Sequence, residues 1–272
     1  MNAGNGARQD RVALVTGVSR RNGIGYAVAR RLAAQGAHLV LTHHRPHDEQ
    51  QPWGGDDIDA VVAGVREACR GDQRVIDVSV DLAEPDAPER VMARAVEEFA
   101  HVDVLICNHA RSGGDGPLGT LTAEMLDAHW AANTRSSLLL AQAFAAQHDG
   151  RPGGRVVFMT SGQGQGPMPG EIAYAAAKAA LAGVTLTVAD QLADAGITVN
   201  CVNPGPVDTG YTTPELTEQL KPMFPFGRIG EPDDPARLIA WLVSDDGRWM
   251  TGQVLNTEGG FARWRAAAPE GP

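Results

Sequence analysis

The sequence is poor in the features that mark several common classes of protein. It has only three cysteines in 272 residues, and such a sparse, odd number provides no disulfide framework and suits a reducing compartment. The first ten residues contain no apolar run, so we predict no signal peptide, and no apolar run approaches the roughly 18 residues that cross a bilayer. The formal net charge is -10, which argues against a nucleic-acid-binding protein. We expect a cytoplasmic protein without membrane or nucleic-acid partners.

Patterns of metal ligands are equally sparse. His43, His44 and His47 lie close together in the sequence. No acidic residue or cysteine accompanies them at the spacing that metal sites use, so we predict that the protein holds no metal.

What is present is a regular alternation of apolar runs with segments of helical periodicity. The apolar runs are nearly continuous, which indicates strands of a parallel sheet covered on both faces. We therefore predict an α/β fold: a Rossmann-like doubly wound parallel sheet flanked by helices on both faces, in a single domain over residues 11–261. The predicted strands are 11–17, 38–44, 74–82, 102–108, 154–161, 197–205 and 253–257, and the predicted helices are 26–37, 58–70, 86–100, 121–148 with a possible break near Asn133, 172–195 and 234–243.

Three segments are predicted to lie outside these elements. Residues 47–57 are polar and rich in turn formers, which indicates a mobile surface loop. Residues 1–10 and 262–272 are expected to be a flexible N-terminus and a C-terminal tail, each loose or engaged in subunit contacts.

A glycine-rich stretch, TGVSRRNGIG at residues 16–25, connects the first predicted strand to the first helix. Glycines in this position let the backbone approach a phosphate, and the following helix N-terminus offers free N–H groups and a favourable dipole. The stretch therefore favours a dinucleotide site, although a tight turn that needs glycine only for its geometry is the alternative.

The second predicted strand ends in THHR, and its last residues bear on which dinucleotide would bind. An acid at this point would hold the ribose 2′-OH of NAD, whereas a basic residue suits the 2′-phosphate of NADP. No Asp or Glu ends the strand; Arg45 follows it, and Arg20 and Arg21 lie in the glycine loop. Because guanidinium groups match phosphate geometry, we favour NADP(H) over NAD(H), unless these arginines are merely solvated.

The stretch YAAAK places Tyr174 and Lys178 four residues apart among alanines. On a helix the two side chains share a face. An ammonium group there lowers the pKa of a phenol, which would let it exchange a proton near neutral pH. The pattern is common by chance, so an ordinary helix edge is the alternative.

The order of these features resembles the short-chain dehydrogenase/reductase family in its one-domain form, over about residues 11–261. Ser161 precedes Tyr174 by the 13 residues typical of the family, and Lys178 follows. Further segments that resemble family motifs are VDL at 80–82, DVLICNHA at 103–110, AAN at 131–133, NPGPVDT at 203–209 and the region 227–261.

The resemblance implies a catalytic set of Asn133, Ser161, Tyr174 and Lys178. Tyr174 would protonate the substrate oxygen while hydride arrives from the nicotinamide, and Ser161 would hydrogen-bond that oxygen. Lys178 would hold the nicotinamide ribose and, with the oxidised nicotinamide, favour the phenolate. Asn133 would bind a water that links Lys178 to solvent.

The cofactor site implied by the loop, the arginines and the resemblance consists of Gly17, Ser19, Arg20, Arg21, Gly23, Ile24, Arg45, Asp81, Leu82, Asn108, Tyr174, Lys178, Pro204, Gly205, Val207 and Thr209. Two departures from the family pattern stand out. The loop has two extra residues between Gly17 and Gly23, and CNHA replaces the usual Asn-Asn-Ala-Gly. His109 and Arg111 would therefore either reach the substrate or lie on a surface loop.

The segment 206–228 is expected to be a lid over the substrate. Tyr211, Leu216, Met223 and Phe224 would line an apolar pocket or pack on another subunit, and residues 167–169 would form the opposite wall. Such a pocket suits a small carbonyl or alcohol substrate.

Among relatives, the chain looks most like 3-oxoacyl-carrier-protein reductases and related carbonyl reductases, so it would reduce a ketone or 3-oxoacyl group, as a free molecule or as an acyl-carrier-protein or CoA thioester. Arg135 and Arg151 are candidates for a basic patch that meets a carrier protein. The alternatives are an NAD-dependent secondary-alcohol dehydrogenase and a non-catalytic dinucleotide-binding protein. The family usually forms homotetramers, or dimers, through the helices that carry Asn133 and Tyr174.

Overall fold

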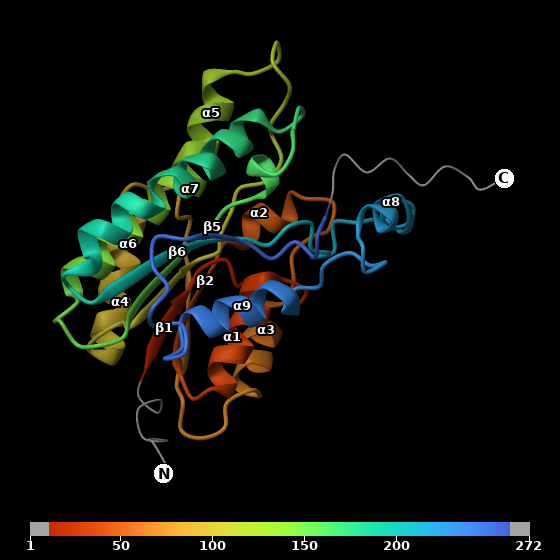
Figure 1. Ribbon diagram of the computed structural model, residues 1–272. Helices are drawn as coiled ribbons and strands as arrows, with labels where there is room; N and C mark the ends of the chain where they lie inside the picture. Colours follow the sequence, from red (N-terminus) through yellow and green to blue (C-terminus); the bar gives the residue numbers. More distant parts are fainter. Residues whose placement is uncertain (1–10, 262–272) are drawn as a thin grey trace.

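The computed structural model describes residues 11–261, and in this range seven strands form one sheet (Figure 1). The strands are β1 (Val12–Val15), β2 (His38–His43), β3 (Val75–Ser79), β4 (Val104–Cys107), β5 (Gly154–Met159), β6 (Ile197–Asn203) and β7 (Val254–Asn256). Their spatial order is β3-β2-β1-β4-β5-β6-β7, and every neighbouring pair is parallel. The strand order reverses between β1 and β4, which is where open α/β sheets bind ligands. The predicted fold class is confirmed.

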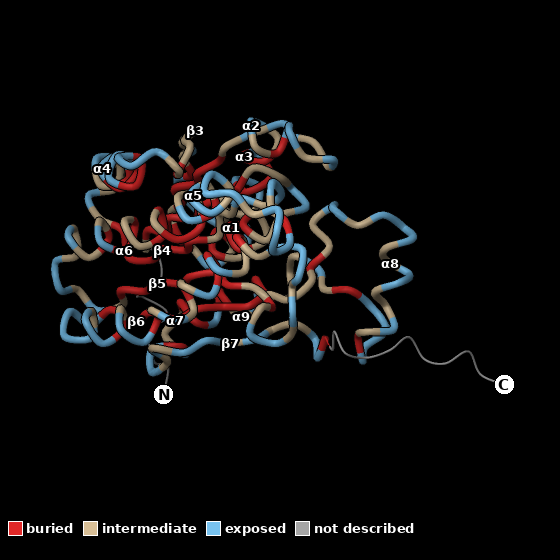
Figure 2. Tube along the Cα trace, turned by 90° about the horizontal axis from the view of Figure 1, so that it is seen from above, coloured by how far each residue is buried: buried red, intermediate tan, exposed pale blue. Residues whose placement is uncertain are grey.

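Two helical layers cover the sheet (Figures 1 and 2). The α-helices are α1 (Ile24–Ala34), α2 (Arg45–Glu49), α3 (Ile58–Arg66), α4 (Ala87–Phe99), α5 (Ala123–His129), α6 (Ser136–Gln147), α7 (Ile172–Ala193), α8 (Pro214–Leu220) and α9 (Asp233–Leu242). A π-helical turn, η1 (Trp130–Arg135), joins α5 to α6, and short 3-10 turns occupy Gly162–Gly164 (η2) and Lys221–Met223 (η3).

Side chains alternate between the two faces of each strand, which explains why the central strands are largely apolar. In β1, Ala13 and Val15 pack with α1, α3 and α9, whereas Val12 and Leu14 pack with α4, α6 and α7. Both faces are therefore buried, as a parallel sheet between two helical layers requires.

Two predicted loops contain helices. The segment predicted as a mobile surface loop begins as α2, with Pro46 in its first turn, and buries Asp48. The predicted lid contains α8, whose N-terminus is capped by Thr213: its hydroxyl accepts a hydrogen bond from the Leu216 N–H at 3.2 Å. Both helices are short, so their periodicity is too brief to stand out in the sequence.

Helix α7 is apolar and long enough, by length and composition alone, to span a membrane, with a mean hydropathy of 1.6. No such span is expected from the sequence. One face of α7 packs on the sheet through Ala177, Lys178, Leu181 and Thr185. A helix packed in the core of an α/β protein can have the same length and hydropathy as a membrane-spanning helix. The buried lysine on this face, Lys178, belongs to the site described below.

Candidate active site

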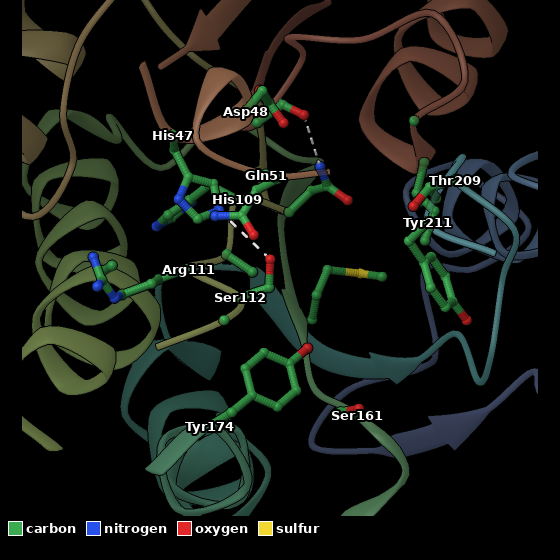
Figure 3. Close-up of a pocket in the computed structure, with 18 of the residues that line it drawn as sticks. His47, Asp48, Gln51, His109, Arg111, Ser112, Ser161, Tyr174, Thr209 and Tyr211 are labelled. Atoms are coloured by element: carbon green, nitrogen blue, oxygen red, sulfur yellow. Dashed lines mark hydrogen bonds between the residues drawn. The ribbon is translucent and has the colours of Figure 1, made fainter. Parts of the chain in front are cut away.

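A cavity of about 980 Å³ opens at the carboxyl ends of the strands, on both sides of the point where the strand order reverses. Its walls come from the segments that follow β1, β2, β3, β4, β5 and β6. Figure 3 shows Tyr174 pointing its hydroxyl into this space beside Ser161, with His47, Gln51 and Ser112 on the opposite side. The topology therefore brings together most of the segments in which the sequence predicts functional residues.

The loop between β1 and α1 is shaped by close backbone contact. Gly17 has a φ of +72°, and a Cβ there would lie 2.7 Å from the Cα of His109. Asn108 holds the loop by donating from Nδ2 to the carbonyl oxygens of Thr16 and Gly17 at 3.0 and 3.1 Å. The first turn of α1 follows, without an acidic residue among Ile24 and its neighbours. This cradle fits the pyrophosphate of a dinucleotide, because the backbone is accessible and the helix N-terminus is positive.

Most of the predicted cofactor residues lie together. Those that line the cavity are Gly17, Ser19, Arg20, Gly23, Ile24, Asp81, Leu82, Asn108, Tyr174, Lys178, Pro204, Gly205, Val207 and Thr209. Arg21 and Arg45 are placed elsewhere: Arg21 forms an ion pair with Asp56 at 2.8 Å, and Arg45 pairs with Glu49 at 2.9 Å. Of the three arginines that favoured NADP(H), Arg20 is therefore the one that reaches the cavity.

Arg20 meets an acid that the sequence analysis missed. Its Nε lies 3.0 Å from Oδ1 of Asp48, and its Nη1 donates to the carbonyl oxygen of Thr209. Asp48 Oδ2 also accepts a hydrogen bond from the Ser19 hydroxyl at 2.5 Å, and the indole of Trp53 lies near Oδ1 at 3.4 Å. Its position could have pointed to this role, because Asp48 follows the end of β2 by only five residues, but the polar sequence of the segment predicted a loop.

Tyr174 and Lys178 stand on the first turns of α7, and both line the cavity. Burial raises the pKa of Tyr174 to about 12, and a hydrogen bond with Ser161 acts in the opposite direction. Burial also lowers the pKa of Lys178 to about 8. The Lys178 ammonium donates to the carbonyl oxygen of Met159 at 3.0 Å and lies 5.8 Å from the centre of the Tyr174 ring. In the protein alone, burial therefore outweighs the hydrogen bond with Ser161 and keeps the phenol protonated.

Asn133 lies in the π-helical turn η1 and is fully buried, outside the set of residues that line the cavity. Its Oδ1 accepts from the N–H of Arg111 at 2.7 Å, and its Nδ2 donates to the carbonyl oxygen of Arg111 at 3.2 Å. The side-chain amide of Asn133 thus forms two hydrogen bonds with the backbone of the loop after β4. Mid-helix π-turns of this kind are frequent at functional sites.

The same loop is tied to α7 by Asp115, which the sequence analysis did not select. One carboxylate oxygen of Asp115 accepts from the N–H of Ala173 at 3.0 Å, and the other from the N–H of Tyr174 at 2.7 Å. Partial burial acts to raise the pKa of Asp115, but these bonds and one from Gly116 lower it overall. Asp115 therefore caps α7 from a distant segment and fixes the backbone of Tyr174.

His109 replaces a small residue of the family pattern, and both of its ring nitrogens are engaged. Nδ1 lies 2.6 Å from the Thr16 hydroxyl, and Nε2 lies 2.7 Å from the Ser136 hydroxyl. Both hydroxyls also donate to backbone carbonyl oxygens, Ser136 to Ala132 at 2.6 Å and Thr16 to Ile106 at 3.1 Å, so each can accept a hydrogen bond from the imidazole. Burial and the nearby Lys178 lower the pKa of His109 to about 3, so the ring is neutral. His109 thus links the end of β1 to the η1–α6 junction.

The substrate end of the cavity differs in part from the prediction. Tyr211 and Met168, from the predicted lid and the opposite wall, line it, and so do Leu220 and Phe261. Leu216, Met223 and Phe224 are not among the lining residues; Phe224 is buried against Ile229 and Phe261. Arg135 and Arg151 lie away from the cavity, where Arg135 donates to the carbonyl oxygen of Ala83 and Arg151 pairs with Asp149.

Known proteins match nearly the whole chain. A family model described as enoyl-(acyl carrier protein) reductase matches residues 17–262. The chain is 41% identical over 257 residues to an uncharacterized oxidoreductase of Bacillus subtilis, YjdA, with 94% of this chain and 98% of that protein covered. It is similar to the solved structure of a short-chain dehydrogenase from Burkholderia cenocepacia in complex with NADP, with a TM-score of 0.81, 35% identity, and 93% and 98% of the two chains covered. A similar structure is LugOII, a promiscuous reductase that catalyses keto-reduction at C1, with a TM-score of 0.80, 31% identity and the same coverage.

Proposed function

The chain belongs to the short-chain dehydrogenase/reductase family, and on this premise we propose that it reduces a ketone or 3-oxoacyl group to a secondary alcohol with NADP(H). Members of this family are NAD(P)-dependent oxidoreductases that act on small-molecule alcohols and carbonyls. The observation that carries the proposal is the meeting of Ser161, Tyr174 and Lys178 in one cavity with the glycine loop.

The nicotinamide cofactor, when bound, supplies the hydride. Tyr174 donates its proton to the carbonyl oxygen as that oxygen gains negative charge, and the Ser161 hydroxyl stabilises the same oxygen. A protonated phenol is the form that reduction needs, and burial holds Tyr174 in that form by raising its pKa to about 12. Lys178 contributes the nearby positive charge that eases loss of the proton. Asn133 and Asp115 hold the surrounding loop and the first turn of α7 in place.

NADP(H) is favoured by Arg20, whose guanidinium lines the cavity and offers donors suited to a phosphate. The similarity to a structure solved with NADP agrees with this preference. Asp48 favours the second candidate, an NAD-dependent secondary-alcohol dehydrogenase, because an acid beside the ribose would accept a hydrogen bond from its 2′-OH. A non-catalytic role is disfavoured by the presence of all members of the catalytic set.

We also propose that the protein is a cytoplasmic homotetramer. Trp130, at the end of α5, and Leu186, on α7, are 48% and 67% exposed. Apolar side chains this exposed on neighbouring helices suit contact with a second copy of the chain. Arg151 pairs with Asp149, and Arg135 donates to the carbonyl oxygen of Ala83, so neither arginine favours binding of a carrier protein. The proposed substrate is therefore a free small molecule.

A side-by-side fluorescence titration with NADPH and NADH, followed by a panel of ketones and 3-oxoacyl thioesters, tests the proposal. We expect NADPH to bind about ten-fold more tightly, which corresponds to ~1.4 kcal/mol, and at least one ketone to be reduced. Tyr174→Phe should bind NADPH normally and turn over no substrate. Tighter binding of NADH would favour the dehydrogenase, and binding of neither would refute both enzymatic functions.

A further inference from the structure

The acid that holds Arg20 bears directly on cofactor choice. Asp48 is only 6% exposed, lines the cavity, and receives Arg20 Nε, the Ser19 hydroxyl and the Trp53 indole. Its negative charge thus lies inside the site, in contact with the one predicted phosphate ligand that reaches the cavity.

We propose that Asp48 is a specificity-determining residue that competes with the cofactor's 2′-phosphate for Arg20 and Ser19 and so limits the preference for NADPH. The inference rests on the proposed function for the assignment of Arg20 to the phosphate. Any anionic group that Arg20 binds in this cavity lies next to the Asp48 carboxylate, because Arg20 and Asp48 are 3.0 Å apart. The phosphate meets a guanidinium that is already neutralised and a carboxylate that repels it.

The surroundings keep Asp48 in this position. In its own segment, the Gln51 N–H donates to the Asp48 carbonyl oxygen at 3.0 Å, and the neighbouring His47 lies 3.5 Å from the Ser112 hydroxyl across the cavity (Figure 3). Arg20 is held in turn by the carbonyl oxygen of Thr209. Movement of the Asp48 carboxylate away from a bound phosphate would therefore break its contacts with Arg20, Ser19 and Trp53.

Asp48→Asn tests the competition, because asparagine keeps the shape and a hydrogen-bond acceptor while it removes the charge. Asp56→Asn is the matched control: Asp56 pairs with Arg21 of the same loop at 2.8 Å, away from the cavity. Dissociation constants of NADPH and NADH are measured for wild type and both variants by cofactor fluorescence, without substrate. Thermal melting checks that each variant folds, and Asp48→Ser replaces Asp48→Asn if it does not.

We expect Asp48→Asn to tighten NADPH binding about ten-fold, the scale of one screened like-charge contact, with NADH binding unchanged within about two-fold and no effect of Asp56→Asn. Weaker binding of NADH would overturn the proposal, since Asp48 would then bind the ribose hydroxyl. The proposal would also be overturned if Asp48→Asn bound NADPH more weakly or changed the affinities for both cofactors equally. The same would follow if Asp56→Asn tightened NADPH binding as much as Asp48→Asn does. If wild type prefers NADH, the proposed NADP(H) preference fails separately, and a shift of the variant towards NADPH still supports the role of Asp48.

Discussion

Replacing Lys178 by methionine should stabilise the protein while it abolishes turnover. Lys178 is 2% exposed, and its ammonium donates to the carbonyl oxygen of Met159 at 3.0 Å. Burial lowers its pKa from 10.5 to about 8, which means that the folded protein holds the charged form at a cost. Methionine has a similar length and carries no charge, so it removes that cost.

The magnitude follows from the size of the pKa change. A fall from 10.5 to about 8, at ~1.36 kcal/mol per pKa unit, corresponds to roughly 3 kcal/mol. Loss of the hydrogen bond to Met159 offsets about 1.5 kcal/mol of this gain. The net stabilisation is therefore about 2 kcal/mol, which raises the melting temperature by roughly 4–8 °C in a domain of this size.

The pH dependence provides a sharper check. The folded pKa lies below the unfolded one, so the cost is fully present below pH 8 and disappears as the pH rises towards 10.5. The difference between Lys178→Met and wild type, measured by thermal unfolding, should therefore be largest at neutral pH and fall as the pH rises from 8. It should change sign before pH 10.5, where only the loss of the hydrogen bond to Met159 remains. Lys221→Met is the control, since Lys221 is exposed and paired with Glu218, and it should leave the melting temperature unchanged. A lower melting temperature for Lys178→Met at pH 7 would refute the reasoning.

Three further changes have outcomes that the structure defines. Because burial raises the pKa of Tyr174 to about 12, the protein without cofactor should show no tyrosinate absorbance from this residue below about pH 11, and comparison with Tyr174→Phe measures it. Asp115→Ala removes the cap of α7, so it should lower stability by about 1 kcal/mol and reduce kcat without changing the affinity for NADPH; a change in affinity alone would contradict this. Gly17→Ala should weaken binding of both NADPH and NADH, because its Cβ would lie 2.7 Å from the His109 backbone, and unchanged titrations would show that the loop adapts.

The fold was predictable because the sheet is buried on both faces. Its central strands are therefore largely apolar, as β1 and β4 are, and the long helices between them carry clear periodicity. The predicted break near Asn133 corresponds to the π-helical turn η1. The short helices α2 and α8 were missed, because five and seven residues give too little periodicity to distinguish from a loop.

The site was predictable where residues share a short stretch of chain. Tyr174 and Lys178 are one helical turn apart, so their proximity follows from the sequence alone. Asp48 and Asp115 act on residues far away in the chain, Arg20 and Tyr174, and only the folded backbone brings them into contact. Arg45 shows the converse: it stands at the expected position after β2, but its side chain pairs with Glu49 on the exposed side of α2.

Transfer of deuterium to a reduced ketone, from NADPH that carries deuterium at both positions of the nicotinamide C4, tests the central claim most directly. Mass spectrometry of the alcohol product measures it for wild type and Tyr174→Phe, with NADPH binding followed in parallel. The account predicts one deuterium in the alcohol formed by wild type, and no labelled alcohol from Tyr174→Phe although it binds NADPH as tightly. Label transfer by Tyr174→Phe at the wild-type rate, or none by wild type with any carbonyl compound, would contradict it.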